Sequence, residues 1–193
     1  MTRPFAVLIS GAAGTGKSTL ATALAPRLGA AVLDLDVATG PLTDVLAGLL
    51  GRTDLSDPKI AELTRVPRYE TLLALAEDNL RAGIPVVLVA PFTAERSPAG
   101  WTVVTDRLGA HAAGVLLVWL DLPADRLVAR LKQRGAVRDS DKVSDPGAFL
   151  AGIQRDPPAV PHLALTATSP VAELVDRVAG YMARHGLAID GTP

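Results

Sequence analysis

Eight residues near the amino terminus, Gly11-Ala-Ala-Gly-Thr-Gly-Lys17-Ser18, constrain the fold more than any other part of the sequence. They fit the pattern G-x-x-x-x-G-K-[ST] at every defined position. The apolar run Phe5–Ile9 precedes them, and Thr19–Ala25 continues as a helical segment. Glycines at such a turn let backbone N–H groups surround phosphate, while Lys17 reaches the terminal phosphates and Ser18 ligates Mg²⁺. The segment predicts a nucleotide site formed by Gly11, Ala13, Gly14, Thr15, Gly16, Lys17, Ser18 and Thr19.

Short apolar runs alternate with helical segments along the rest of the chain. Runs that lack polar alternation are typical of strands covered on both faces. Helical spacing is clearest between Tyr69 and Leu80, and further helices are expected after Pro123 and Pro170. The pattern predicts an α/β fold with a five-stranded parallel sheet and helices on both faces. The expected strands are Phe5–Ile9, Ala31–Leu33, Val86–Val89, Val115–Leu120 and His162–Leu165.

A chain of 193 residues is long enough for one domain, which we expect to span residues 1–187. Two stretches fit the strand and helix alternation poorly. Residues 38–66 are expected to form a helical flap between the second strand and its following helix. Residues 134–147 are charged, are bounded by Gly and Pro, and are expected to form a lid. Residues 188–193 are expected to be a frayed tail.

Composition excludes several classes of function. The sequence has 19 basic and 20 acidic residues, so no broad positive surface for long nucleic acid or an anionic membrane is expected. It contains no Cys, which excludes a disulfide framework, a thiolate metal site and a cysteine nucleophile. The longest apolar run is too short to span a bilayer. These features predict a cytoplasmic protein.

A pair of acidic residues, Asp34 and Asp36, ends the second expected strand. Acids two residues apart project from the same side of a strand, toward the crevice where doubly wound sheets bind ligands. We expect Asp34 to belong to the Mg²⁺ shell and Asp36 to anchor or deprotonate a substrate hydroxyl. The alternative is a solvated strand end at which Asp36 caps the next helix. The acid that commonly ends the third strand of nucleotide hydrolases is absent, because Ala90 occupies that place.

With these motifs in order along nearly the whole chain, the sequence resembles the small-molecule P-loop kinases. That group includes shikimate kinase, gluconate kinase and chloramphenicol phosphotransferase, with zeta-type toxins and polynucleotide kinases as more distant relatives. The sequence also resembles AAA-type ATP-binding proteins of uncharacterised activity. The resemblance rests on Gly11–Ser18, Asp34-Leu-Asp36, an arginine-rich helix before the lid, and Thr166-Ala-Thr-Ser-Pro170. It implies a P-loop NTPase fold, ATP and Mg²⁺, and transfer of the γ-phosphoryl group to a hydroxyl.

Arginines precede and enter the expected lid. Arg126, Arg130 and Arg134 are spaced by four residues and share one helix face, and Arg138 follows. The resemblance implies that Arg130 stacks on adenine, that Thr168 lies near the nucleotide, and that Arg134 or Arg138 approaches the phosphates during catalysis. The alternative is a solvated helix face, because like charges at this spacing normally lie in water.

The resemblance also places the acceptor beside Asp36, Arg65, Arg68 and Phe92. Two arginines there suit an anionic or polyhydroxylated molecule; the alternative is a helix start with exposed arginines. The predicted function is ATP-dependent phosphorylation of a small hydroxylated molecule by a monomer or homodimer. One alternative is a zeta-toxin-like or polynucleotide-kinase-like enzyme that acts on a nucleotide or nucleotide sugar. Another is a regulatory ATP-binding module that hydrolyses ATP slowly.

Overall fold

A five-stranded parallel sheet forms the centre of the protein. The computed structural model describes residues 3–51, 58–135, 143–153 and 155–187. The strand order is β2-β3-β1-β4-β5, so the strand that precedes the glycine-rich turn lies in the middle. All five expected strands are confirmed, with bounds within a residue or so of those predicted. They are β1 (Ala6–Ser10), β2 (Ala31–Asp34), β3 (Val86–Val89), β4 (Val115–Asp121) and β5 (Leu163–Thr166).

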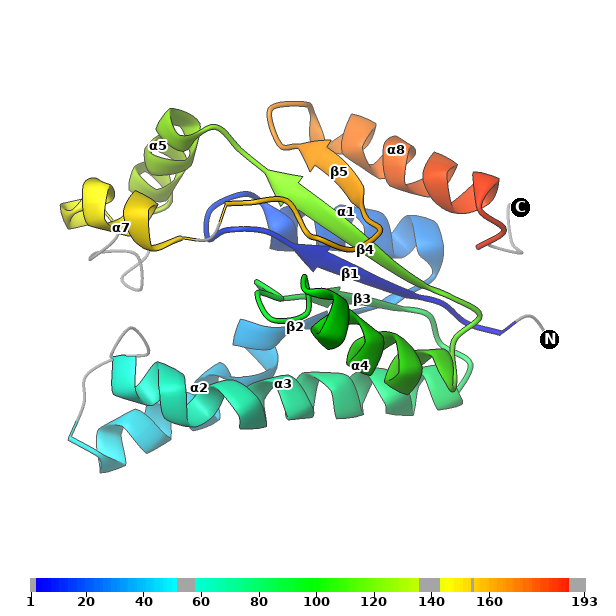
Figure 1. Ribbon diagram of the computed structural model, residues 1–193, viewed down its shortest axis with the longest axis horizontal. Coiled ribbons are helices and arrows are strands. Elements are labelled where there is room, and N and C mark those ends of the chain that lie inside the picture. The colour runs from blue at the N-terminus through cyan, green and yellow to red at the C-terminus, as the bar shows by residue number, and fades with distance from the viewer. Residues whose placement is uncertain (1–2, 52–57, 136–142, 154, 188–193) are drawn as a thin grey trace.

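Helices cover both faces of this sheet (Figure 1). One face carries α1 and α8, which pack against each other, and the opposite face carries α3 and α4. The α/β fold with a parallel sheet between helical layers is therefore confirmed. The helices are α1 (Lys17–Leu28), α2 (Leu35–Leu49), α3 (Pro58–Arg81), α4 (Pro98–Gly109), α5 (Ala124–Arg134), α7 (Pro146–Gly152) and α8 (Val171–Arg184).

The central position of strand β1 explains why its sequence is continuously apolar. Val7 and Ile9 belong to the core beneath α1 and α8, whereas Ala6 and Leu8 belong to the core beneath α3 and α4. Each of these four residues is fully buried. A central strand between two helical layers has no solvated face, so the period-two alternation of a half-exposed strand is absent.

The region predicted as a flap, residues 38–66, is not inserted before a separate helix. Helix α2 begins at Leu35, immediately after β2, because the Asp34 carboxylate caps its first turn. Helix α3 runs without interruption from Pro58 to Arg81, so the end of the predicted flap lies within it. Residues 52–57, between these helices, lie outside the described residues. The region predicted as a flap thus comprises most of α2 and the first turns of α3.

The predicted lid, residues 134–147, is described only at its two ends. Its first residue ends α5 and its last two begin α7. The predicted tail, residues 188–193, lies outside the part of the chain that the structure describes. Within the described residues, no helix is both long and apolar enough to cross a membrane.

Candidate active site

The glycine-rich turn connects β1 to α1 and follows the backbone path expected of a phosphate-binding loop. Gly11, Gly14 and Gly16 have φ values of 149°, 84° and 96°. A Cβ atom on Gly11 would lie 2.3 Å from the backbone oxygen of Leu120, so a larger residue cannot occupy this position without moving β4. Residue Gly16 is the N-cap of α1, which places the positive end of the helix at the loop.

Two side chains of the loop bond to its own backbone. The Lys17 Nζ atom donates a hydrogen bond to the carbonyl oxygen of Ala12 at 2.9 Å, and Thr15 Oγ1 donates to the same oxygen at 3.0 Å. Thr15 is almost fully buried, whereas Lys17 lines an open cavity. The ammonium group is therefore held at the loop, where an anion would be attracted to it.

A cavity of about 400 Å³ lies on the α5 side of the loop; we call it the Arg130 cavity. The Arg130 guanidinium spans it by donating from Nη1 to the Thr15 carbonyl at 3.2 Å and from Nη2 to the Ala167 carbonyl at 2.6 Å. Apolar side chains form much of the remaining wall, which suits a flat heterocycle. The lining residues are Gly14, Thr15, Gly16, Thr19, Leu20, Leu120, Arg130, Gln133, Ala167, Ser169, Val171 and Leu174.

A second cavity, of about 450 Å³, lies on the α2 and α3 side of the loop; we call it the Asp36 cavity. It shares Gly14, Gly16 and Thr19 with the Arg130 cavity, so the two spaces meet at the phosphate loop. Polar groups from the loop, α2 and α3 converge in it. Its lining residues are Ala13, Gly14, Gly16, Lys17, Ser18, Thr19, Asp34, Leu35, Asp36, Ala61, Arg65, Arg68, Tyr69, Val89, Ala90, Pro91 and Thr93.

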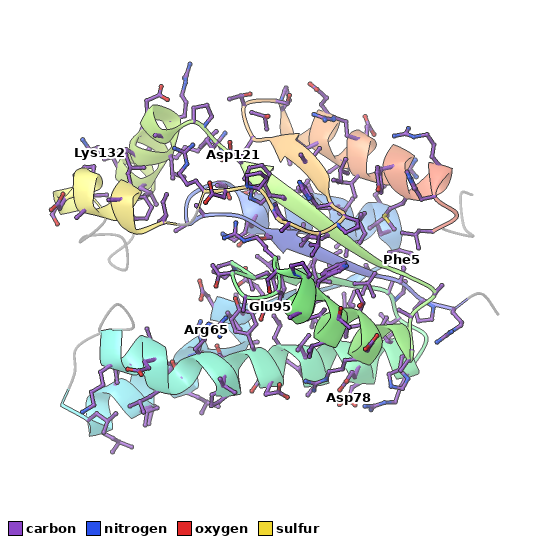
Figure 2. All side chains as sticks on the ribbon, viewed as in Figure 1. Phe5, Arg65, Asp78, Glu95, Asp121 and Lys132 are labelled. Carbon is purple, nitrogen blue, oxygen red and sulfur yellow. The ribbon has the colours of Figure 1, made fainter. Side chains whose placement is uncertain are left out.

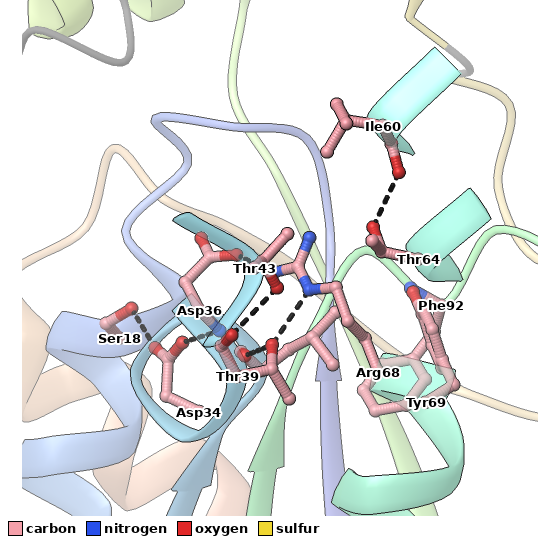
Figure 3. Close-up of polar contacts among 11 residues, drawn as sticks. Ser18, Asp34, Asp36, Thr39, Thr43, Ile60, Thr64, Arg68, Tyr69 and Phe92 are labelled. Atoms are coloured by element: carbon pink, nitrogen blue, oxygen red, sulfur yellow. Dashed lines mark hydrogen bonds and ion pairs between the residues drawn. The ribbon is translucent and has the colours of Figure 1, made fainter. Parts of the chain in front are cut away.

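The two acids of the Asp36 cavity have different partners (Figure 3). Asp34 accepts a hydrogen bond from the Ser18 hydroxyl at 2.7 Å and, with its other oxygen, from the backbone N–H of Asp36 at 2.9 Å. Asp36 pairs instead with Arg68, whose Nη2 atom lies 2.6 Å from its carboxylate. The expectation that both acids project from one strand was wrong, because the strand ends at Asp34 and Asp36 lies in the first turn of α2.

Arg68 is fixed by more than its ion pair. Its Nε atom donates to the Thr39 hydroxyl at 2.8 Å, and Thr39 in turn donates to the Leu35 carbonyl. Thr39 is buried on the inner face of α2 and was not identified from the sequence. Its only sequence signal is its place one turn after Asp36, on the same helix face.

Arg65 lies over the ring of Tyr69, with 5.4 Å between its guanidinium carbon and the ring centroid. The Tyr69 hydroxyl accepts a hydrogen bond from the backbone N–H of Phe92 at 3.0 Å. Burial, with the nearby Glu95 carboxylate as a smaller cause, raises the pKa of Tyr69 to about 12. The hydroxyl is thus neutral at physiological pH and holds the turn after β3 against α3.

The structure places Phe92 differently from the prediction. Its side chain is fully buried and packs edge-on against Tyr69, with ring centroids 5.8 Å apart. Its φ of 49° makes it the one non-glycine residue with positive φ within the described ranges. Because the ring turns into the core, Thr93 and Pro91 line the cavity in its place.

Other predicted residues are divided between the cavities and their surroundings. Gly11 and Thr168 are absent from the described lining, although Ala167 and Ser169 on either side of Thr168 are present. The Arg126 side chain is 72% exposed and lies 3.9 Å from Asp125, whereas Arg130 contacts the phosphate loop. Residue Arg134 ends α5, but its side chain, like all of Arg138, lies outside the described part. Gln133, one turn after Arg130, is a lining residue that was not predicted.

Ala90 directly follows β3, is buried, and lines the Asp36 cavity. No carboxylate therefore stands at the end of this strand. Among the described residues no group of three His, Cys, Asp or Glu side chains could hold a metal ion. The hydroxyl of Ser18 and the carboxylate of Asp34 are nevertheless adjacent oxygen ligands of the kind that Mg²⁺ prefers.

Comparison with known proteins places this geometry in context. A family model described as an AAA domain matches residues 7–154. No curated protein matches the sequence significantly. A sugar kinase from Janibacter has a similar fold, with 20% identity, a TM-score of 0.62, and coverage of 93% of this chain and 95% of that one.

Two further kinases have comparable similarity. A gluconokinase from Sinorhizobium meliloti is 20% identical, with a TM-score of 0.60 and coverage of 96% of this chain and 95% of that one. The Mycobacterium tuberculosis APS kinase, in complex with AMPPNP and APS, is 19% identical, with a TM-score of 0.63 and coverage of 95% and 99%. At these identities the likeness establishes a shared fold.

Proposed function

The chain belongs to the AAA domain family, and on that premise we propose that it is an ATP-dependent phosphotransferase acting on a hydroxyl of a small molecule. The observation that carries this proposal is the meeting of two cavities at one phosphate loop. Gly14, Gly16 and Thr19 line both cavities, so a triphosphate lying along the loop would reach from one cavity to the edge of the other. The terminal phosphate would then face the groups around Asp36.

The Arg130 cavity is assigned to the nucleotide base. Its apolar walls suit a purine, and the Arg130 guanidinium lies between the loop and the β5 end of the sheet. The backbone N–H groups of the loop and the Lys17 ammonium would hold the phosphates. These charges stabilise the negative charge that develops on the phosphoryl oxygens during transfer.

Ser18 and Asp34 fit Mg²⁺, and we assign the ion to them. Ser18 would ligate the ion and Asp34 would hold its water ligands, because both oxygens already lie within hydrogen-bond distance. When bound, Mg²⁺ neutralises charge on the β- and γ-phosphates. Among the described residues, no cluster of three possible ligands surrounds this site, so the phosphates of the nucleotide would supply much of the Mg²⁺ coordination.

Asp36 is assigned to the acceptor hydroxyl. The hydroxyl oxygen would form a bond to the γ-phosphorus as the bond to the β-phosphate oxygen breaks, releasing ADP. The hydroxyl proton would pass to the Asp36 carboxylate, which acts as a general base. Arg68, whose Nη2 atom lies 2.6 Å from this carboxylate, orients it toward the acceptor hydroxyl.

The acceptor is proposed to carry an anionic group or several hydroxyls. Arg68 is paired with Asp36, whereas Arg65 lies over the face of the Tyr69 ring. A guanidinium over an aromatic ring can still donate from the N–H groups in its own plane to a carboxylate, sulfate or phosphate. Arg65 and Asp36 would thus recognise opposite ends of a small hydroxylated anion.

The test is a product assay with a panel of small hydroxylated molecules, including hydroxy acids, sugars and nucleosides. ADP release that requires one of them, together with a product heavier by one phosphoryl group in mass spectrometry, is the expected result. Asp36→Asn should abolish most of this transfer. Asp44→Asn serves as the matched control, because Asp44 is an exposed acid on the same helix, away from the cavity lining.

Two outcomes would contradict the proposal in different ways. Slow ADP release that no acceptor increases would favour the regulatory ATP-binding module, for which Ala90 in place of an acid is the supporting observation. Phosphorylation confined to nucleotides or nucleotide sugars would favour the zeta-toxin-like alternative. Lys17→Ala should lower turnover by about two to three orders of magnitude in either case, so it tests the phosphate loop separately.

A further inference from the structure

Helix α2 turns its more apolar face to solvent. Leu42, Val45, Leu46 and Leu49 are 77%, 60%, 37% and 80% exposed. Their spacing of i, i+3, i+4 and i+7 puts them on one face of the helix. The buried residues of α2 are Leu35, Thr39, Gly40, Thr43 and Ala47. A surface helix of a monomer normally has the opposite arrangement, with large aliphatic residues inside.

The polar inner face of α2 has a structural reason. Thr39 and Thr43 each donate to the backbone carbonyl four residues earlier, and the Thr39 hydroxyl also accepts from Arg68. This face therefore helps to position Arg68 in the Asp36 cavity. Among the described residues, α2 makes its main contacts with α3 and β2, and the outward leucines have no such positioning role there.

The neighbouring helix also carries an exposed aliphatic residue. Leu63, in the second turn of α3, is 53% exposed, and α2 packs along α3 (Figure 1). We call Leu42, Val45, Leu46 and Leu49 the α2 patch. Its exposed fractions amount to about two and a half whole aliphatic side chains, or roughly 250 Å² of apolar surface. That is the apolar centre of an interface at the small end of the range for specific complexes.

The charges of α2 limit what can cover the patch. The helix has no basic residue, so it offers an anionic membrane surface or nucleic acid no attracting charge. The α2 patch itself is uncharged and offers a strongly charged partner nothing to pair with. An uncharged face whose aliphatic side chains recur every three or four residues does suit an identical face, because side chains of one helix can fit between those of the other. A two-fold axis needs only one such self-complementary surface.

We propose that the α2 patch is the contact surface of a homodimer, with α2 of one chain packed against α2 of a second copy across a two-fold axis. Because the area is small, the dimer exchanges with monomer at micromolar concentrations rather than being obligate. This proposal does not depend on the catalytic activity.

Sedimentation equilibrium of the full chain tests it, over concentrations spanning roughly two orders of magnitude around the micromolar range. The mass should rise from that of one 20.0 kDa chain to twice that value. The double variant Leu42→Gln/Leu49→Gln should weaken association at least tenfold, since glutamine keeps helix propensity while removing apolar contact. Val103→Gln is the matched control, because Val103 is 65% exposed on α4, far along the chain from the patch. AMPPNP binding shows that each variant is folded.

A cysteine cross-link gives an independent measurement. The chain has no native Cys, so Val45→Cys introduces one thiol at the centre of the patch, and mild oxidation should convert most of the protein to a disulfide-linked dimer. Val103→Cys should remain largely monomeric. A wild-type chain that stays monomeric, a dimer unaffected by the double variant, or equal cross-linking at both cysteines would overturn the proposal. So would co-sedimentation with phosphatidylcholine vesicles, which would assign the patch to a membrane surface.

Discussion

Asp34 and Asp36 lie two residues apart but have separate partners, and this separation makes their roles experimentally distinguishable. Asp34 bonds to Ser18, whereas Asp36 bonds to Arg68. Asp36→Asn should lower phosphoryl transfer by about two orders of magnitude while leaving ATP affinity nearly unchanged, because only the acceptor side loses its base. Asp34→Asn should instead raise the Mg²⁺ concentration required for half-maximal activity. Asparagine is also a good N-cap, so α2 should remain folded.

The measurement is a Mg²⁺ titration of activity in both variants, beside Asp44→Asn, with ATP affinity followed by calorimetry. If activity depended on Mg²⁺ concentration in the same way in both cavity variants, Asp34 and Asp36 would not have separate roles.

The buried hydroxyl of Tyr69 makes the stability of the protein depend on pH. Its pKa of about 12 in the folded protein lies above the usual value of about 10. Between these values the unfolded chain loses the phenolic proton while the folded chain keeps it. The contribution to unfolding free energy is therefore complete below about pH 10 and is lost as pH rises through about 12. Tyr69→Phe should flatten this part of the stability profile.

The chain has only two tyrosines, so Tyr181→Phe leaves Tyr69 as the sole phenol. Its tyrosinate absorbance should appear near pH 12, with circular dichroism reporting whether the fold is intact. Ionisation near pH 10 in the folded protein would contradict the burial of this hydroxyl.

At the scale of elements, α5 presents two arginines of unequal importance. Arg130 bonds to the phosphate loop and to the chain after β5, whereas Arg126, one turn earlier, is largely exposed. Arg130→Ala should weaken AMPPNP binding by about one to two orders of magnitude, the scale of lost hydrogen bonds from a charged group. Arg126→Ala should change it less than twofold. Calorimetry in the presence of Mg²⁺ measures both, and equal losses would mean that the helix charge acts collectively.

The whole molecule is arranged as two sides around the phosphate loop. Helices α2 and α3 flank the Asp36 cavity, and α5 leads toward α7 on the other side. In Figure 2, Arg65 marks the α3 side and Lys132 the α5 side. Helix α7 has no fully buried residue, although Phe149 and Leu150 pack partly against the core. Such weak anchoring favours local opening.

Hydrogen exchange should reveal closure of α7 over bound nucleotide. Amides of Ala148–Gly152 should exchange rapidly without ligand and several-fold more slowly with AMPPNP and Mg²⁺. Helix α8 is the internal control, because Leu174, Val178 and Met182 are buried and its exchange should not change. Equal protection of α7 in both states would identify it as static. Whether Arg134 and Arg138 reach the phosphates remains a prediction, tested by their alanine variants.

The sequence by itself determined the sheet, the phosphate loop and the helices that follow the prolines. These features depend on local signals: glycines where φ is positive, continuous apolar runs for buried strands, and proline just before a first helical turn. Each signal acts over a few residues, so it can be recognised without knowing what lies elsewhere in the chain. Asp34 was placed beside the loop from its position at the end of a strand, and Arg130 from the family resemblance.

Only the tertiary structure decided which side chains meet. The Asp36–Arg68 pair joins residues 32 positions apart, and the buried ring of Phe92 packs against Tyr69 of helix α3. The inner face of α2 likewise carries Thr39, which bonds to Arg68 of helix α3. Helical periodicity shows that residues share a face, but it does not show which neighbour that face contacts. That choice is made by the packing of distant segments, and their contact energies are not encoded in any single stretch of sequence.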